Sequence, residues 1–153
     1  MKGIKFGSVI SFCILISGTF TLAQNKSIPK SNSGIYKLID LYSQAREKQD
    51  TILLKSILTP DIDQLVSTGE WRHGLSSAIK GMLRSTASKS GKSTISVDKI
   101  KYIGSSVAVV DTRYDVPNPD GNIRKMWSCF VVVKNRNNWK ISSIRNMMPT
   151  GQN

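Results

Sequence analysis

The stretch VAVVDTRYDV, residues 107–116, decides the fold class, because apolar and polar side chains are arranged along it with a period of two. Such a period places successive side chains on opposite faces of a β-strand. One face carries Val107, Val109, Asp111, Arg113 and Asp115, and the other carries Ala108, Val110, Thr112, Tyr114 and Val116. Both faces begin apolar, so we expect helices to cover one side and a partner subunit to cover the other.

The segments on either side of this stretch also have strand patterns. Residues 95–102 predict a strand whose phase slips near Asp98, as a β-bulge would cause. Residues 119–121, Pro-Asp-Gly, form a turn sequence, and two further strands are predicted over 124–134 and 139–148. The second half of the chain is therefore expected to be a meander of four antiparallel strands.

The register of the last two predicted strands depends on the loop between them. If residues 135–138 form that loop, Lys134 lies opposite Trp139. The same register pairs Val132 with Ile141, Phe130 with Ser143, and Ser128 with Arg145. The other face then carries Trp127, Cys129, Val131, Val133, Ile144 and Asn146. The pattern leaves open which of these faces lines a cavity.

The part of the chain before the strands has helical spacing. A first helix over residues 33–49 is predicted by one apolar stripe: Ile35, Leu38, Ile39, Tyr42 and Ala45. Asp50 is expected to cap a short second helix that Pro60 closes, and a third helix follows Gly74 and runs to about Ala87. A short strand or irregular segment would separate the second and third helices. The fold class is therefore α+β, with three helices before the sheet.

The first residues of the chain have the pattern of an export signal. Lys2 and Lys5 precede an apolar stretch, and Thr21-Leu22-Ala23 provides a cleavage site before Gln24. We therefore expect residues 1–23 to be a signal peptide, and the protein to be periplasmic or secreted without a stable membrane span. Residues 24–32 are predicted to be a flexible leader, residues 33–149 a single domain, and residues 150–153 a tail.

The composition excludes several classes of function. The net charge is +12, but the basic residues are spread along the chain and no nucleic-acid-binding motif accompanies them, so no nucleic-acid partner is expected. One histidine and two cysteines are too few for a His-based or Cys/His metal site. Glycine-rich phosphate loops and dinucleotide fingerprints are absent from the sequence, so no cofactor is expected. Cys129, within WSCFVVV, is expected to be a buried structural thiol.

The stretch TGEWRHGL, residues 68–75, contains the chain's one histidine. His73 is a candidate acid or base near neutral pH, and a solvated loop histidine is the alternative interpretation. Trp71 is expected to form a wall or lid of a cavity. Glu70 and Arg72 are expected to face solvent.

Five short stretches of the sequence, by their order and spacing along the chain, resemble the SnoaL-like branch of the nuclear transport factor 2-like superfamily. They are YSQAREKQD, LTPD, WRHG, VAVVDT and WKISSIRN, and the resemblance extends from Ile35 to Met148. It implies a cone-shaped, curved antiparallel sheet wrapped around the three helices, a cavity between helices and sheet, and homodimers packed sheet to sheet. Members of the family include cyclases, isomerases and dehydratases as well as non-catalytic proteins, so the fold does not settle the activity.

The leading hypothesis is a homodimeric, exported domain that binds a small, partly apolar molecule in the cone. The residues expected to contact it are Trp71, Trp127 and Phe130 as apolar groups, with His73, Asp111, Arg113 and Arg145 as polar groups. A second hypothesis is an isomerase-, cyclase- or dehydratase-like enzyme with Asp111 or His73 as general base, which requires that residue to point into a cavity. The third is a structural or protein-binding module with a filled cone. For Asp111, an ion pair with Arg113 is the alternative to a site role.

Overall fold

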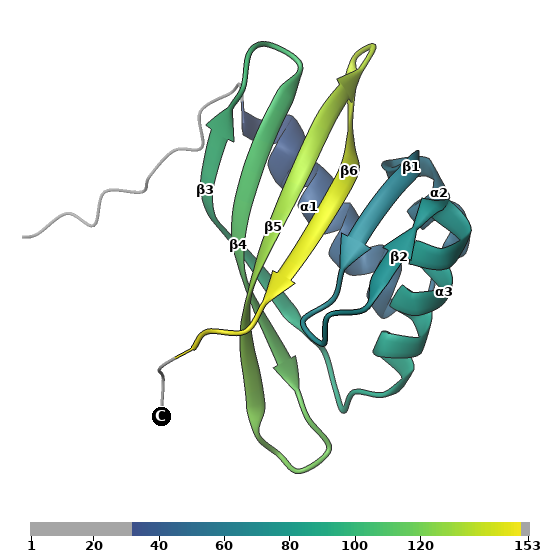
Figure 1. Ribbon diagram of the computed structural model, residues 1–153, viewed down its shortest axis with the longest axis vertical. Coiled ribbons are helices and arrows are strands. Elements are labelled where there is room, and N and C mark those ends of the chain that lie inside the picture. Colours follow the sequence, from purple (N-terminus) through teal and green to yellow (C-terminus); the bar gives the residue numbers. More distant parts are fainter. Residues whose placement is uncertain (1–31, 151–153) are drawn as a thin grey trace, which may run out of the picture.

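The structure, a computed structural model, describes residues 32–150, which form three helices and one six-stranded sheet (Figure 1). The helices are α1 (Ser33–Glu47), α2 (Thr51–Ile57) and α3 (Gly74–Ala87). The strands are β1 (Leu58–Leu65), β2 (Trp71–His73), β3 (Thr94–Tyr102), β4 (Val107–Pro117), β5 (Ile123–Asn135) and β6 (Asn138–Met147). The predicted signal peptide and nearly all of the predicted leader lie outside the described residues. Within residues 32–150, no helix has the length and apolar character needed to span a membrane.

The strands are ordered β2-β1-β6-β5-β4-β3 across the sheet. The α+β class and the antiparallel meander from β3 to β6 are confirmed. Between α2 and α3 the chain forms two strands, where the sequence indicated a short strand or an irregular segment. Because β1 pairs with β6 in parallel and with β2 antiparallel, the sheet is mixed rather than wholly antiparallel.

Two β-bulges set which side chains face the helices. The predicted bulge in β3 is present, because the pairing with β4 shifts between Val97 and Lys99. A second bulge between β5 and β6 leaves Ser142 unpaired, so Phe130 lies opposite Ile144 and Ser128 lies opposite Asn146. The predicted Phe130–Ser143 and Ser128–Arg145 pairs are therefore wrong, since one extra residue in a strand reverses every later side chain. Arg145 lies opposite Cys129 instead.

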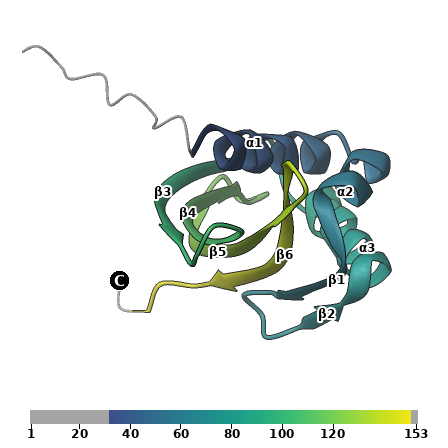
Figure 2. The same ribbon diagram turned by 90° about the horizontal axis from the view of Figure 1, so that it is seen from above.

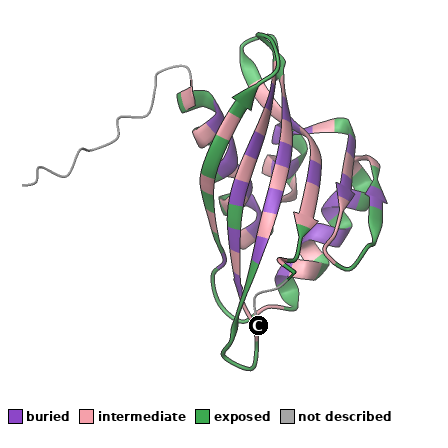
Figure 3. Cartoon of the chain, turned by 60° about the vertical axis from the view of Figure 1, so that its left-hand side comes forward, coloured by how far each residue is buried: buried purple, intermediate pink, exposed green. Residues whose placement is uncertain are grey.

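The core lies between α1 and the concave face of the sheet. Figure 2 shows the sheet curving around α1, with α2 and α3 beside β1 and β2. The predicted apolar stripe of α1 is buried, and it packs against sheet residues that include Val110, Phe130, Val132, Ile141 and Ile144. Buried residues alternate with more exposed ones along the strands (Figure 3), so one face of the sheet is covered and the other is open. The Asp50 carboxylate caps α2 by accepting a 2.9 Å hydrogen bond from the Leu53 N–H.

Candidate functional site

A cavity of about 230 Å³ opens beyond one end of the apolar core, and we call it the cone cavity. Helix α1 contributes Arg46 to its wall, and the β1–β2 turn contributes a segment that ends at Glu70. The remaining walls come from β1, β2, the last turn of α3, and β4, β5 and β6, and they include Gln64, Arg72, Arg84, Ser85, Tyr114, Val116, Met126 and Asn146. Polar and apolar groups therefore share the lining.

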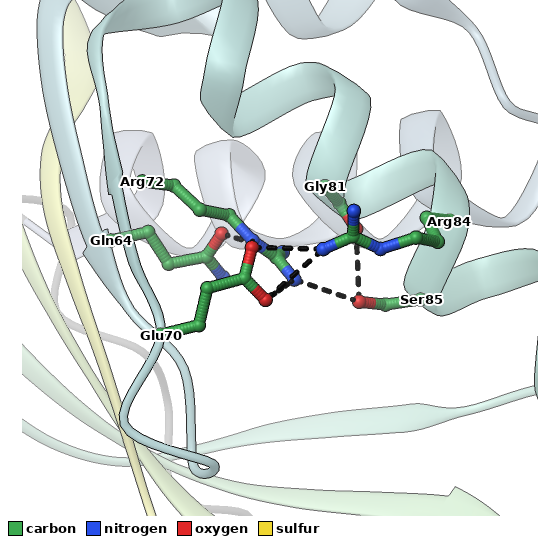
Figure 4. Close-up of polar contacts among 6 residues, drawn as sticks. All are labelled: Gln64, Glu70, Arg72, Gly81, Arg84 and Ser85. Atoms are coloured by element: carbon green, nitrogen blue, oxygen red, sulfur yellow. Dashed lines mark hydrogen bonds and ion pairs between the residues drawn. The ribbon is translucent and has the colours of Figure 1, made fainter.

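Arg72 is the centre of a hydrogen-bond network in one wall of this cavity (Figure 4). Its Nε and Nη2 donate to the Glu70 carboxylate at 3.0 and 3.2 Å, and its Nη1 donates to Gln64 Oε1 at 3.2 Å. Nη2 also lies 3.4 Å from Ser85 Oγ, and Arg84 Nη2 donates to Glu70 at 2.8 Å. The hydrogen bonds from Arg72, followed by those from Arg84, lower the pKa of Glu70. This carboxylate therefore forms ion pairs with two guanidinium groups.

Arg72 is only 3% exposed, so the prediction that it faces solvent is wrong. In the three-residue strand β2, side chains alternate, and those of Trp71 and His73 are exposed while that of Arg72 is buried. Gly81 of α3 provides the space for it: a Cβ atom built there would lie 2.2 Å from Arg72 Nε. The alternation in β2 and the glycine in α3 are both apparent in the sequence, but the contact between Arg72 and Gly81 is not.

Arg46 is a second buried arginine, and it too is absent from the sequence-based candidates. Its side chain is 7% exposed and bridges two tyrosines: its Nη1 donates to the Tyr114 hydroxyl at 2.9 Å, and its Cζ lies 5.7 Å from the centre of the Tyr42 ring. Its Nη2 lies 3.3 Å from Thr86 Oγ1. Burial raises the pKa of Tyr42, so this phenol stays neutral beside the cation. The spacing of four between Tyr42 and Arg46 already placed both on the buried stripe of α1.

In the part of the chain that the structure describes, the charge of Arg46 has no carboxylate partner. Among residues 32–150, no aspartate or glutamate forms an ion pair with it. Its Nε–H is buried and has no hydrogen-bond acceptor in the same part of the chain. A buried donor without an acceptor costs roughly 1–3 kcal/mol, and more for a charged group, and a ligand that accepts from the donor would remove this cost.

The residues predicted from the sequence to form a site lie elsewhere. Phe130 is in the core, where it packs edge to face against Tyr42 with ring centres 5.3 Å apart. The other six lie on the outer face of the sheet, opposite the face that packs against α1: Trp71, His73, Asp111, Arg113, Trp127 and Arg145. None of the seven lines the cone cavity. The alternation of strand side chains separates them from it.

On the outer face, cations pair with aromatic rings and with one carboxylate. Arg145 donates to Asp63 at 2.8 Å and lies 4.7 Å from the centre of the Trp71 ring, which is stacked on His73. The hydrogen bonds from Arg145 lower the pKa of Asp63. Arg113 lies 3.1 Å from the centre of the Trp127 ring and forms no ion pair with Asp111 in the described part of the chain. The expected Asp111–Arg113 ion pair is therefore not formed.

Cys129 is half-buried on the outer face and is the one cysteine among residues 32–150. Burial, together with a hydrogen bond to Asp111 and the charge of that carboxylate, raises the pKa of its thiol to about 11. The thiol is therefore protonated at neutral pH, and only the thiolate is a good nucleophile.

We expect Cys129 to resist alkylation in the folded protein. Iodoacetamide at pH 7.5 should modify it at least about tenfold more slowly in native buffer than in urea, because unfolding returns the thiol to its ordinary pKa of about 8.5. Mass spectrometry of timed samples measures both rates. Equal rates in the two conditions would show that the thiol is exposed and activated.

The described residues contain no group of three or more His, Cys, Asp or Glu side chains arranged to hold a metal ion. What the cone cavity offers instead is hydrogen-bond donors: guanidinium groups, hydroxyls and the side-chain amides of Gln64 and Asn146. Its one carboxylate, Glu70, already accepts from Arg72 and Arg84. The arrangement can therefore bind and orient a molecule that accepts hydrogen bonds.

A curved sheet wrapped around helices, with a cavity beyond the end of its core, defines a class of small cone-shaped α+β domains. The sequence matches no protein-family model and no curated protein. The structure is similar to several solved structures, and the chain has the fold of the nuclear transport factor 2-like superfamily, as the sequence predicted.

One of these structures is a domain of unknown function with a cystatin-like fold from Nostoc punctiforme, with a TM-score of 0.69, 16% identity and 82% of each chain covered. A nuclear transport factor 2-like superfamily protein from Salmonella enterica has a TM-score of 0.64 and 19% identity over 80% of this chain and 94% of that one. A ketosteroid isomerase-like protein from Erwinia carotovora has a TM-score of 0.64 and 12% identity over 78% of this chain and 97% of that one. Identities this low show the fold alone.

Proposed function

We propose that this chain is an exported protein of the SnoaL-like branch that binds a small molecule in the cone cavity. The observation that carries the proposal is that three buried polar side chains, Arg46, Gln64 and Arg72, line one cavity beside the apolar core. Buried polar groups cost stability unless they are used, and binding sites are concave surfaces with a few fixed polar groups. The volume, about 230 Å³, is below the roughly 300–1,000 Å³ of sites for drug-sized ligands, so it suits a small metabolite.

Binding is favoured over catalysis by the position of the candidate bases. His73 and Asp111 lie on the outer face of the sheet, and the general-base hypothesis requires one of them in the cavity. The Glu70 carboxylate, which does line it, has a lowered pKa and two arginine partners, which makes it a weak base. The open cavity also disfavours a structural module with a filled cone.

We also propose that the protein is exported and forms a homodimer. The basic and apolar pattern of residues 1–23 supports export to the periplasm or beyond. The outer face of the sheet carries half-buried Val107, Val109, Val131 and Val133 in register on β4 and β5, a surface suited to a second copy of the chain. Sedimentation analysis of the mature protein measures this, and a monomer at high micromolar concentration would contradict the homodimer.

A blocked-cavity variant tests ligand binding. We expect a library of small metabolites to contain at least one that raises the melting temperature of the wild-type protein by several degrees, since a ligand at 100 times its Kd adds about 2.7 kcal/mol. Ser67→Trp places an indole in the cavity wall and should abolish the shift. The matched control is Ser77→Trp, at an exposed position of α3 outside that wall, which should retain it. No stabilising compound, or equal shifts in all three proteins, would refute binding in this cavity.

A further inference from the structure

The charges around the cone cavity are unbalanced. Its lining contains four arginines, Arg46, Arg72, Arg84 and Arg124, and one carboxylate, that of Glu70. Glu70 forms ion pairs with Arg72 and Arg84, which uses the one negative charge that residues 32–150 contribute to the lining. Arg46 and Arg124 therefore face the cavity without a carboxylate partner among residues 32–150.

The two unpaired arginines differ in environment. Arg124, the second residue of β5, is exposed, so water solvates its charge. Arg46 is buried between Tyr42 and Tyr114 and has lost most of that solvation, and its Nε–H has no acceptor within residues 32–150. Neutral hydroxyls satisfy two of its nitrogens but do not neutralise it. A buried cation of this kind is stabilised when an anion lies beside it.

The rest of the lining indicates which kind of anion fits. Val66, Val116 and Met126 form apolar parts of the wall, and the Asn146 amide of β6 contributes a polar group. A carboxylate is planar, as is the guanidinium group, and accepts paired hydrogen bonds from it. A carbon skeleton attached to the carboxylate would cover the apolar part of the wall.

We propose that the ligand of the cone cavity is a small organic acid, whose carboxylate lies between Arg46 and Arg124 and whose carbon skeleton contacts Val66, Val116 and Met126. This inference rests on the proposed function, because it names the class of molecule that the same cavity binds. It assigns the selection of charge to Arg46 and Arg124, whereas the Arg72–Glu70–Arg84 network shapes the wall.

Matched acids and amides test the selection of charge. The probes are butyrate and benzoate, their neutral counterparts butyramide and benzamide, and inorganic phosphate, each titrated calorimetrically into the full mature protein at low salt. We expect at least one of the acids to bind about tenfold or more tightly than its amide, because the amide cannot form a charge-assisted hydrogen bond. Phosphate should bind more weakly than that acid, since it has no carbon skeleton.

Three variants test which side chains cause the difference in affinity between the acid and its amide. Arg46→Gln and Arg124→Gln should each weaken binding of the acid about tenfold and leave the amide unchanged. Lys101→Gln removes the same charge from an exposed position outside the cavity and should change binding less than about twofold. Arg124 is exposed, so its variant tests the inference even where Arg46→Gln fails to fold.

Each contrary result has a distinct meaning. Amides that bind as tightly as acids, or a metabolite ligand without a negative charge whose binding Ser67→Trp abolishes, would overturn the organic acid and leave small-molecule binding intact. Phosphate binding that depends on Arg46, without binding of either acid, would overturn the carboxylate. The absence of any ligand, among both these probes and the metabolite library, would overturn both proposals.

Discussion

Gly81→Ala is expected to lower the free energy of unfolding by about 2–4 kcal/mol. The sign is unusual, because the same change within a helix ordinarily stabilises a protein by about 1 kcal/mol. The reason is Arg72, whose Nε, Cδ and Cζ would lie 2.2–2.4 Å from the new Cβ atom. The guanidinium would have to move, and it would lose its hydrogen bonds to Gln64 and Ser85 while remaining a buried charge.

A double-mutant cycle attributes the loss to that contact. With Arg72→Ala in the background, the space beside Gly81 is open, so adding Gly81→Ala should be neutral or stabilise by up to about 1 kcal/mol. Ser77→Ala, at an exposed position of the same helix, should change stability by less than about 0.5 kcal/mol. Urea unfolding followed by circular dichroism gives the free energy of unfolding of the wild type and of the four variants. Additive effects of Gly81→Ala and Arg72→Ala would contradict the contact.

The fold could be predicted because its signals are local. Alternation along β4 assigned Ala108, Val110, Thr112, Tyr114 and Val116 to one face, and all five are buried. The same holds for the apolar stripe of α1 and for the Asp50 cap of α2. In each case the deciding residues are within a few positions of one another, so periodicity alone specifies which side of the element is covered.

One bulge shows where a local signal was present but was not used. Ile141 and Ile144 are both buried, although residues three apart lie on opposite faces of a regular strand. The extra residue Ser142 brings both onto the core face. Two large apolar residues at this spacing, in a strand otherwise rich in polar residues, favour a bulge. The prediction assumed a regular register and therefore assigned the last residues of β6 to the wrong faces.

The site could not be predicted because its contacts connect distant parts of the chain. Arg46 contacts Tyr114, which is 68 positions away, and Arg72 contacts Ser85 across the space left by Gly81. The sequence contains 22 lysines and arginines. Local spacing could place Arg46 and Arg72 on covered faces, but it could not show that the two lie beside one cavity. His73 was predicted as a site residue because it is the one histidine of the sequence, but it lies on the outer face of β2.

Phe130→Ala is the substitution for which we expect the largest loss of stability, about 3–5 kcal/mol. The sequence suggested Phe130 as a ligand contact, but its side chain is 1% exposed and packs edge to face against Tyr42 in the core. Removing the ring leaves a cavity beneath α1 that the surrounding strands cannot fill, because Val110 and Ile144 are held in place by their pairing across β4, β5 and β6.

The neighbouring residue provides the control. Cys129 is on the opposite face of the same strand and is half-buried, so Cys129→Ala should cost less than about 1 kcal/mol. Urea unfolding measures both changes in stability. Isothermal titration calorimetry with the best ligand of the metabolite library measures the Kd at a temperature where Phe130→Ala is still folded. A core role predicts a large loss of stability with little change in Kd. Unchanged stability together with weakened binding would instead make Phe130 a wall of the ligand site, because a side chain that contacts only ligand does not contribute to the free energy of unfolding of the ligand-free protein.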